Sequence, residues 1–82
     1  MAKINKDVCN YITSEWLHPW LRKGKSQSSF AFNHNIDEST VRKIKRTNGY
    51  RIPLETLEKI CEASGIDLIA FFKMLKAWQK SN

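Results

Sequence analysis

Apolar residues recur three or four positions apart along the whole chain, and residues that cap or end helices separate these periodic segments. No stretch alternates apolar and polar residues over enough positions to indicate a strand. The pattern predicts an all-α fold of five short helices. The expected helices cover residues 7–22, 27–33, 38–46, 54–64 and 68–79.

A chain of 82 residues has room for one hydrophobic core. We therefore expect residues 1–82 to form a single domain, with residues 1–6 and 80–82 frayed at its ends. The apolar face of each helix should supply the core. These faces carry, in chain order, Val8, Ile12, Trp16, Leu17, Trp20 and Leu21; Phe30 and Ala31; Val41 and Ile44; Leu54, Leu57, Ile60 and Cys61; and Leu68, Phe71, Phe72, Leu75 and Trp78.

Capping residues predict where several helices begin. Ser26, Asp37 and Asp67 are expected N-caps, because their side-chain oxygens can accept from the unpaired N–H groups of a first helical turn. Pro19 removes a backbone donor and disfavours the α conformation at His18, so we expect a kink or break in the first helix there.

The connections between helices carry residues typical of turns. Gly24 and Gly65 are expected stops, and Asn35 suits a tight turn because asparagine tolerates a left-handed backbone. Residues 47–50 (Thr-Asn-Gly-Tyr) are expected to form a turn. Pro53 fits the first turn of the fourth helix.

The charge of the chain is concentrated. It carries 14 Lys+Arg and 8 Asp+Glu, a net +6, and residues 25–51 hold six basic and two acidic residues, or four of the six net charges. Five basic residues and no acid lie between Arg42 and Arg51. Such a footprint favours an anionic partner such as nucleic acid, the alternative being a solvated basic face with no partner. No apolar run approaches the roughly 20 residues that a membrane helix needs.

Other chemistries find little support. Cys9, Cys61, His18 and His34 lack the spacing of metal ligands, so we expect no metal, no cofactor and two free thiols in a reducing cytoplasm. No carboxylate pair lies in an apolar setting that would shift its pKa, and capping and turn chemistry explain Ser26, Ser28 and Ser29, so we expect no enzyme and no small-molecule ligand.

The stretch from Gln27 to Arg46 combines a short helix, a tight turn and a second capped helix, which is the arrangement of a helix-turn-helix with its core at residues 26–46. Ala31 is small where the two helices must approach. The outward positions of the second helix hold polar side chains suited to base edges and phosphates, namely Glu38, Ser39, Arg42, Lys43 and Arg46.

Here the sequence resembles a known family. The matching segments are Ser26-Gln27-Ser28-Ser29-Phe30-Ala31, Asn35-Ile36-Asp37 and Thr40-Val41-Arg42-Lys43-Ile44, followed by the run from Pro53 to Ile60 and by Ala63-Ser64-Gly65-Ile66. Over roughly residues 16–72 the chain resembles the lambda-repressor-like (Cro/repressor, XRE-type) helix-turn-helix DNA-binding domains. The resemblance implies a compact five-helix lambda-repressor-like fold.

The resemblance also implies roles for residues. Base contacts would come from Glu38, Ser39 and Lys43. DNA-backbone contacts would come from Gln27, Arg42, Arg46, Asn48 and Arg51. Many members of this family also have an Arg in the first helix that pairs with a Glu ending the third. Trp20 and Lys45 stand at these positions here, so that ion pair is absent, and a stacking contact between them is conceivable. His34 replaces a usual aliphatic residue and Asn35 a usual glycine.

We therefore expect a sequence-specific, double-stranded-DNA-binding regulator of transcription in the cytoplasm, associated with the nucleoid if the source is bacterial or phage. Relatives often bind as dimers, so a homodimer is expected, with an interface at Phe71, Leu75 and Trp78 and half-sites about 34 Å apart. The main alternative is a protein-interaction adaptor that keeps the helix-turn-helix core without contacting DNA. An RNA-binding variant is a further alternative.

Overall fold

The chain begins with one long helical rod, built from α1 (Ala2–Ile12), the π-helical turn η1 (Thr13–Leu17) and α2 (His18–Arg22). In the computed structural model, which describes residues 2–46 and 49–81, four further helices follow it. They are α3 (Gln27–Asn33), α4 (Glu38–Lys45), α5 (Leu54–Ala63) and α6 (Leu68–Ser81). The described residues contain no strand, which confirms the expected all-α fold of five helices.

The rod passes Pro19 without breaking, although the sequence predicted a kink or break there. His18 keeps an α conformation (φ −59°, ψ −44°), and its N–H donates to the carbonyl of Thr13, five residues earlier. The expected break and the expected loss of α conformation at His18 are therefore absent. The π-helical turn η1 directly precedes α2, so the hydrogen-bonding pattern changes just before the proline. Pro19 then lies in the first turn of α2, where a proline is tolerated.

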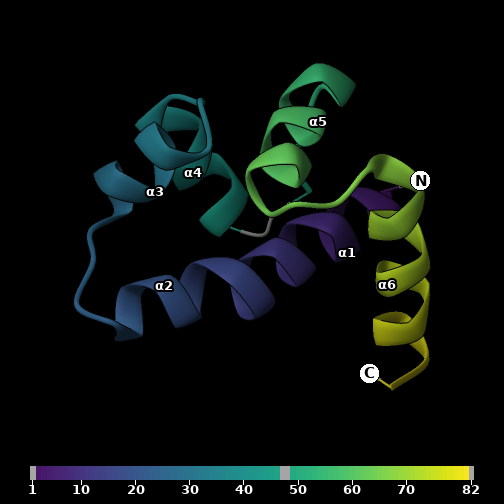
Figure 1. The fold of residues 1–82 in the computed structure, drawn as a ribbon. Coiled ribbons are helices and arrows are strands. Elements are labelled where there is room, and N and C mark those ends of the chain that lie inside the picture. The colour runs from purple at the N-terminus through teal and green to yellow at the C-terminus, as the bar shows by residue number, and fades with distance from the viewer. Residues whose placement is uncertain (1, 47–48, 82) are drawn as a thin grey trace.

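Both terminal helices extend further than expected, α1 back to Ala2 and α6 on to Ser81. The two helices support each other: Gln79 Nε2 donates a hydrogen bond of 2.7 Å to Asp7 Oδ2 across 72 positions of sequence. Figure 1 shows α6 beside the N-terminal end of the rod, with α4 and α5 above the rod in this view.

The boundaries of the two central helices follow the predicted caps. Ser26 and Ser29 form a reciprocal capping box at the start of α3. Asn35 adopts the expected left-handed backbone (φ 58°) in the turn to α4. Asp37 occupies the N-cap position of α4, but its side chain makes no capping hydrogen bond. By contrast, Asp67 Oδ1 accepts from the N–H of Ala70 at 2.8 Å at the start of α6.

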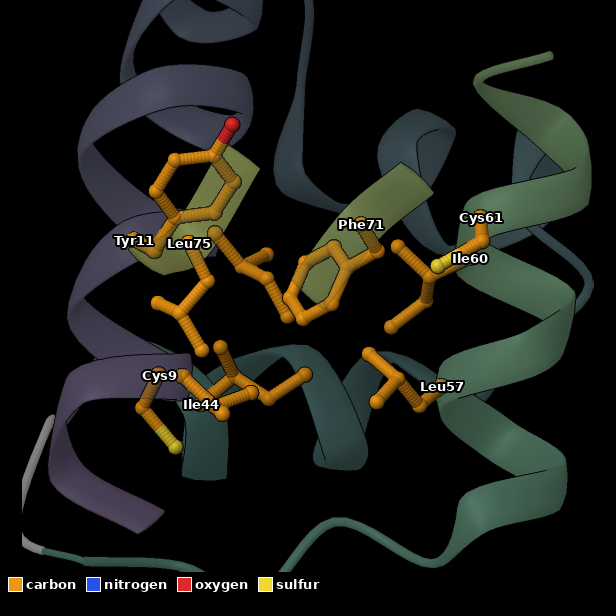
Figure 2. Close-up of a cluster of buried hydrophobic side chains, with 10 residues drawn as sticks. Cys9, Tyr11, Ile44, Leu57, Ile60, Cys61, Phe71 and Leu75 are labelled. Carbon is orange, nitrogen blue, oxygen red and sulfur yellow. The ribbon is translucent and has the colours of Figure 1, made fainter. Parts of the chain in front are cut away.

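The larger core cluster joins the rod to α4, α5 and α6 (Figure 2). Phe71 and Leu75 of α6 enter it beside Tyr11, whose ring meets that of Phe71 edge to face at 5.5 Å. The complete buried set is Val8, Cys9, Tyr11, Ile12, Ile44, Leu57, Ile60, Cys61, Phe71 and Leu75.

A smaller cluster holds the helix-turn-helix against the rod. It consists of Leu17, Phe30, Ala31 and Val41. Since α4 places Val41 in this cluster and Ile44 in the larger one, both cores fix the orientation of α4. The exposed side chains of α4 therefore point in a defined direction relative to the rest of the domain.

Two residues expected in the core lie at the surface. Leu54 is 67% exposed, because it is the first residue of α5 and the helix reaches the core from Leu57 onward. Phe72 is 41% exposed, and it touches the core through an edge-to-face contact with Phe71. No helix of the described chain is long and apolar enough to cross a membrane.

Candidate nucleic-acid interface

One face of α4 is polar and mostly cationic. Since Val41 and Ile44 are buried, the remaining positions of the helix turn outward. Glu38 is half-buried, and four of the side chains expected at an interface are exposed: Ser39, Arg42, Lys43 and Arg46. The structure thus places all five outward-facing residues of the predicted recognition helix on its accessible surface.

Glu38 and Arg42 form an ion pair one helical turn apart. Arg42 Nη1 lies 3.3 Å from Glu38 Oε2, and the two side chains are 54% and 41% exposed. An exposed pair of this kind contributes about 0.3–0.5 kcal/mol. The guanidinium of Arg42 can therefore turn to another anion at little cost.

A cationic hollow lies where the start of α3 meets the end of α4. It has a volume of about 380 Å³ and is lined by Gln27, Arg42, Lys45 and Arg46. At one side of it, Lys45 Nζ donates to Gln27 Oε1 at 3.4 Å. Guanidinium and ammonium groups donate, as does the NH2 of an amide, and such a set suits the oxygens of a phosphate.

Tyr50, which follows α4 in the chain, contacts both α4 and the rod. Lys43 Nζ lies 5.6 Å from the centroid of the Tyr50 ring, and the thiol of Cys9 donates to the Tyr50 carbonyl at 3.4 Å. Arg51, which follows Tyr50, is exposed. Asn48, the other predicted backbone contact of this loop, lies outside the described residues.

Trp20 anchors the N-terminus of α3. Its Nε1–H lies 3.0 Å from both the Ser26 carbonyl and Ser29 Oγ. The cation over its ring is Lys25, at 4.2 Å from the centroid. The conceivable Trp20–Lys45 stacking contact is therefore replaced by two separate pairs, Trp20 with Lys25 and Lys45 with Gln27.

His34, at the end of α3, stands where the family usually has an aliphatic residue, and its ring packs there against an aromatic side chain. Its ring stacks on Phe30 with 3.9 Å between centroids, and Nδ1 donates to the Phe30 carbonyl at 2.7 Å. Burial lowers the pKa of His34, partly opposed by this hydrogen bond. A neutral ring therefore closes the smaller core beside the turn.

The two cysteines are buried, free and 0% exposed. Burial raises the pKa of each thiol to about 11, so both are protonated at neutral pH. Within residues 2–46 and 49–81 there is no group of three or more His, Cys, Asp or Glu side chains that could hold a metal ion.

The fold gathers part of the predicted site and adds residues that the sequence analysis missed. Gln27, Arg42 and Arg46 line one hollow, as a shared backbone contact requires, and Lys45 joins them. The sequence contained an indication of this role for Lys45: it follows Arg42 by three positions and therefore lies near it on the helix. Tyr50 was missed as well, because no local pattern pairs it with Lys43.

The predicted dimer interface is placed differently. Phe71 and Leu75 are 0% and 2% exposed inside the core of a single copy, so they cannot supply surface to a second copy. Trp78 is half-buried and meets Tyr11 edge to face at 5.6 Å. The expectation is therefore wrong for Phe71 and Leu75, which pack against the rod and α5 within one copy, and for Trp78 it stays a prediction.

A short helix, a left-handed turn and a second helix with a cationic outer face, locked together by a common core, define a helix-turn-helix DNA-binding domain. A model of the Cro/C1-type HTH DNA-binding domain family matches residues 21–70, more than half of the chain, and the protein belongs to this family. The resemblance seen in the sequence is thereby confirmed. No curated protein and no solved structure matches the chain.

Proposed function

We propose that this protein is a sequence-specific regulator of transcription that binds duplex DNA in the cytoplasm. In this proposal α4 enters the major groove and α3 lies across the sugar-phosphate backbone. Membership of the Cro/C1-type family supports DNA binding in general. The observation that carries the finer proposal is the hollow of donors formed by Gln27, Arg42, Lys45 and Arg46 beside the exposed face of α4.

The proposed base contacts use the outer face of α4. Lys43 can donate to the O6 and N7 acceptors of guanine, Glu38 can accept from the N4 amine of cytosine, and Ser39 can do either. Each well-placed contact to a base edge contributes about 1–3 kcal/mol of discrimination. The ammonium of Lys43 lies 5.6 Å from the centroid of the Tyr50 ring.

The proposed backbone contacts surround that face. In the hollow, the candidates for phosphate contacts are Gln27, Arg42 and Arg46, with Lys45 added to them. After α4, the candidates are Asn48 and Arg51. With about four to six phosphate contacts, the slope of log affinity against log salt should be near −4 to −5.

The charge of α4 favours DNA over the adaptor alternative. A surface that docks a protein is expected to be apolar at its centre, whereas the exposed side chains of α4 are cationic or hydroxylic apart from the Glu38 carboxylate. Arg42 already partly neutralises that carboxylate.

Selection from a random duplex library tests the proposal. The wild-type protein should enrich one motif. The Lys43→Ala variant should relax preference at one position of it, whereas Arg46→Ala should weaken binding to all duplexes about equally. Folded wild-type protein that enriches no sequence, or whose affinity does not change with salt, would contradict the proposal.

A further inference from the structure

A second hollow, with a volume of about 790 Å³, lies along one side of the rod, and this volume is in the range of sites that hold small ligands. The rod lines it with a row of polar side chains three or four positions apart: Lys3, Asp7, Asn10, Ser14 and His18. The other lining residues are Thr13, Lys45 of α4, and Trp78 and Gln79 of α6. In Figure 1 the rod lies beside both α4 and α6, the helices that close this hollow.

Hydrogen bonds between distant segments hold these elements together at the hollow. Thr13 Oγ1 donates to the Ile44 carbonyl at 3.4 Å, which joins the rod to the end of α4, and Gln79 Nε2 donates to Asp7 Oδ2 at 2.7 Å, which joins α6 to the rod. Thr13 also begins the π-helical turn η1, and π-helical turns within α-helices are frequent at functional sites. Because both ends of the chain meet in this hollow, no local pattern of the sequence indicated a small-molecule ligand.

The charged groups of the hollow favour an anion. Its lysines, Lys3 and Lys45, are exposed, and its one carboxylate, that of Asp7, already accepts from Gln79. Lys45 Nζ donates to Gln27 Oε1 at 3.4 Å, which uses one of the three N–H groups of an ammonium. The hollow therefore has more positive than negative charge and a surplus of donors, and these suit a carboxylate.

Trp78 gives the hollow an aromatic wall. Its side chain is half-buried, and its ring meets that of Tyr11 edge to face with 5.6 Å between the centroids, so packing holds the indole in place. Such a ring offers a large area for packing against a flat apolar group. A ligand that combines an aromatic ring with a carboxylate matches both the indole and the lysines.

We propose that this hollow binds a small aromatic carboxylate, whose ring packs on Trp78 and whose charge is held by Lys45 and Lys3. Lys45 also lines the hollow beside the exposed face of α4, so a ligand that engages its ammonium withdraws it from the phosphate contact proposed for it. The ligand then acts as an effector that weakens DNA binding. This effect rests on the proposed function, whereas the binding of the ligand does not.

Titration of the protein with cinnamate, followed by nuclear magnetic resonance of the backbone amides, tests the binding without DNA. Saturable shifts are expected at Asn10, Ser14 and Gln79, with a dissociation constant of about 0.1–1 mM for a ligand of this size. Cinnamamide has the same ring and shape without the charge, and it should bind about tenfold more weakly. No saturable shift at the hollow, or equal binding of the two compounds, would overturn the proposal.

Single substitutions assign the contacts. Lys3→Gln and Lys45→Gln should each weaken cinnamate binding about three- to tenfold and leave cinnamamide binding unchanged. Lys6→Gln removes the same charge from an exposed position of α1 outside the hollow, and it should bind cinnamate like the wild type. Trp78→Leu should weaken the binding of both compounds, with helix content compared by circular dichroism. Equal effects of Lys3→Gln and Lys6→Gln would show that the hollow does not select the ligand.

Duplex binding measured with and without cinnamate tests the effector role. Saturating cinnamate should lower the affinity of the wild type for its selected duplex about three- to tenfold, as the loss of one phosphate contact does, and should not change that of Lys45→Gln. A wild type whose duplex affinity ignores bound cinnamate would overturn this role. A Lys3→Gln variant that loses as much duplex affinity as Lys45→Gln would assign the hollow to DNA instead. If the wild type binds no duplex, the proposed function fails, and the titration with cinnamate still decides whether the hollow is a ligand site.

Discussion

Arg42 Nη1 lies 3.3 Å from Glu38 Oε2 on the face of α4 that is proposed to meet DNA. Both side chains are partly exposed, so their ion pair adds little to the stability of the fold. In the proposed complex this pair affects binding: the carboxylate of Glu38 engages a guanidinium that would otherwise reach a phosphate, and it offers an acceptor to a base.

Replacing Glu38 with Gln should therefore strengthen non-specific binding and weaken selectivity. We expect affinity for random duplexes to rise about three- to tenfold, because one anion is removed from the interface and Arg42 is released. The free energy of unfolding should change by less than about 0.5 kcal/mol. Fluorescence anisotropy with random and selected duplexes measures both affinities. Glu55→Gln, an exposed carboxylate on α5, is the matched control, and equal behaviour of the two variants would contradict the role given to Glu38.

The contact between Lys45 Nζ and Gln27 Oε1 predicts a different result. Lys45→Gln should lower affinity for all duplexes by a similar factor of about 5–10 and reduce the salt slope by about 0.9, because one phosphate contact is lost. Its sequence preference should stay unchanged. Lys59→Gln on α5 removes the same charge elsewhere and should leave the salt slope nearly unaltered. A changed motif with an unchanged slope would assign Lys45 to the bases instead.

A hydrogen bond from Thr13 joins the rod to the end of α4. Thr13 Oγ1 donates to the Ile44 carbonyl at 3.4 Å in a buried setting, across 31 positions of sequence. Thr13→Val keeps the shape and removes the donor, so unfolding by urea should show a loss of about 1 kcal/mol. Ser14→Ala removes the neighbouring, half-buried hydroxyl, whose hydrogen bonds to the Tyr11 carbonyl (3.5 Å) and to Glu15 Oε2 (3.4 Å) are local, and it should cost less than about 0.5 kcal/mol. Equal losses in the two variants would show that the Thr13 bond contributes nothing particular.

His34 should make stability depend on pH. Burial lowers the pKa of His34 in the folded protein below its ordinary value of 6.5, so the unfolded chain binds the proton more readily. This contribution to stability is complete above pH 6.5 and is lost as the pH falls from there through the folded pKa. His34→Leu should reduce the slope of unfolding free energy against pH in that window. An unchanged slope in urea titrations at pH 7.5 and 5.5 would contradict this.

The thiols of Cys9 and Cys61 should be inert in the folded protein. Both are 0% exposed, and burial raises the pKa of each to about 11. A disulfide-exchange reagent at neutral pH should therefore react with neither cysteine until denaturant unfolds the chain, and then with both. The Ser81→Cys variant supplies an exposed thiol as the positive control. Rapid reaction of one native thiol would show that its helix opens locally.

Interactions between neighbouring residues were sufficient to predict where several helices begin and end. The Ser26 capping box, the left-handed Asn35 and the Asp67 cap involve residues at most three positions apart, so each is present in the sequence as a pattern. The helix-turn-helix was predictable for the same reason: its turn, its caps and its cationic outer positions all lie within residues 26–46.

Contacts between distant segments were decided by the tertiary structure alone. The pairing of Lys45 with Gln27 spans 18 positions and that of Thr13 with Ile44 spans 31, and no local rule specifies either. Helical periodicity predicts which face of α6 is apolar, but it does not say whether the remainder of the domain or a second copy covers that face. In the folded chain, Phe71 and Leu75 are buried within one copy, whereas Ile69 lies at the surface. Secondary structure here follows from neighbouring residues, whereas burial depends on which segments of the chain meet in space.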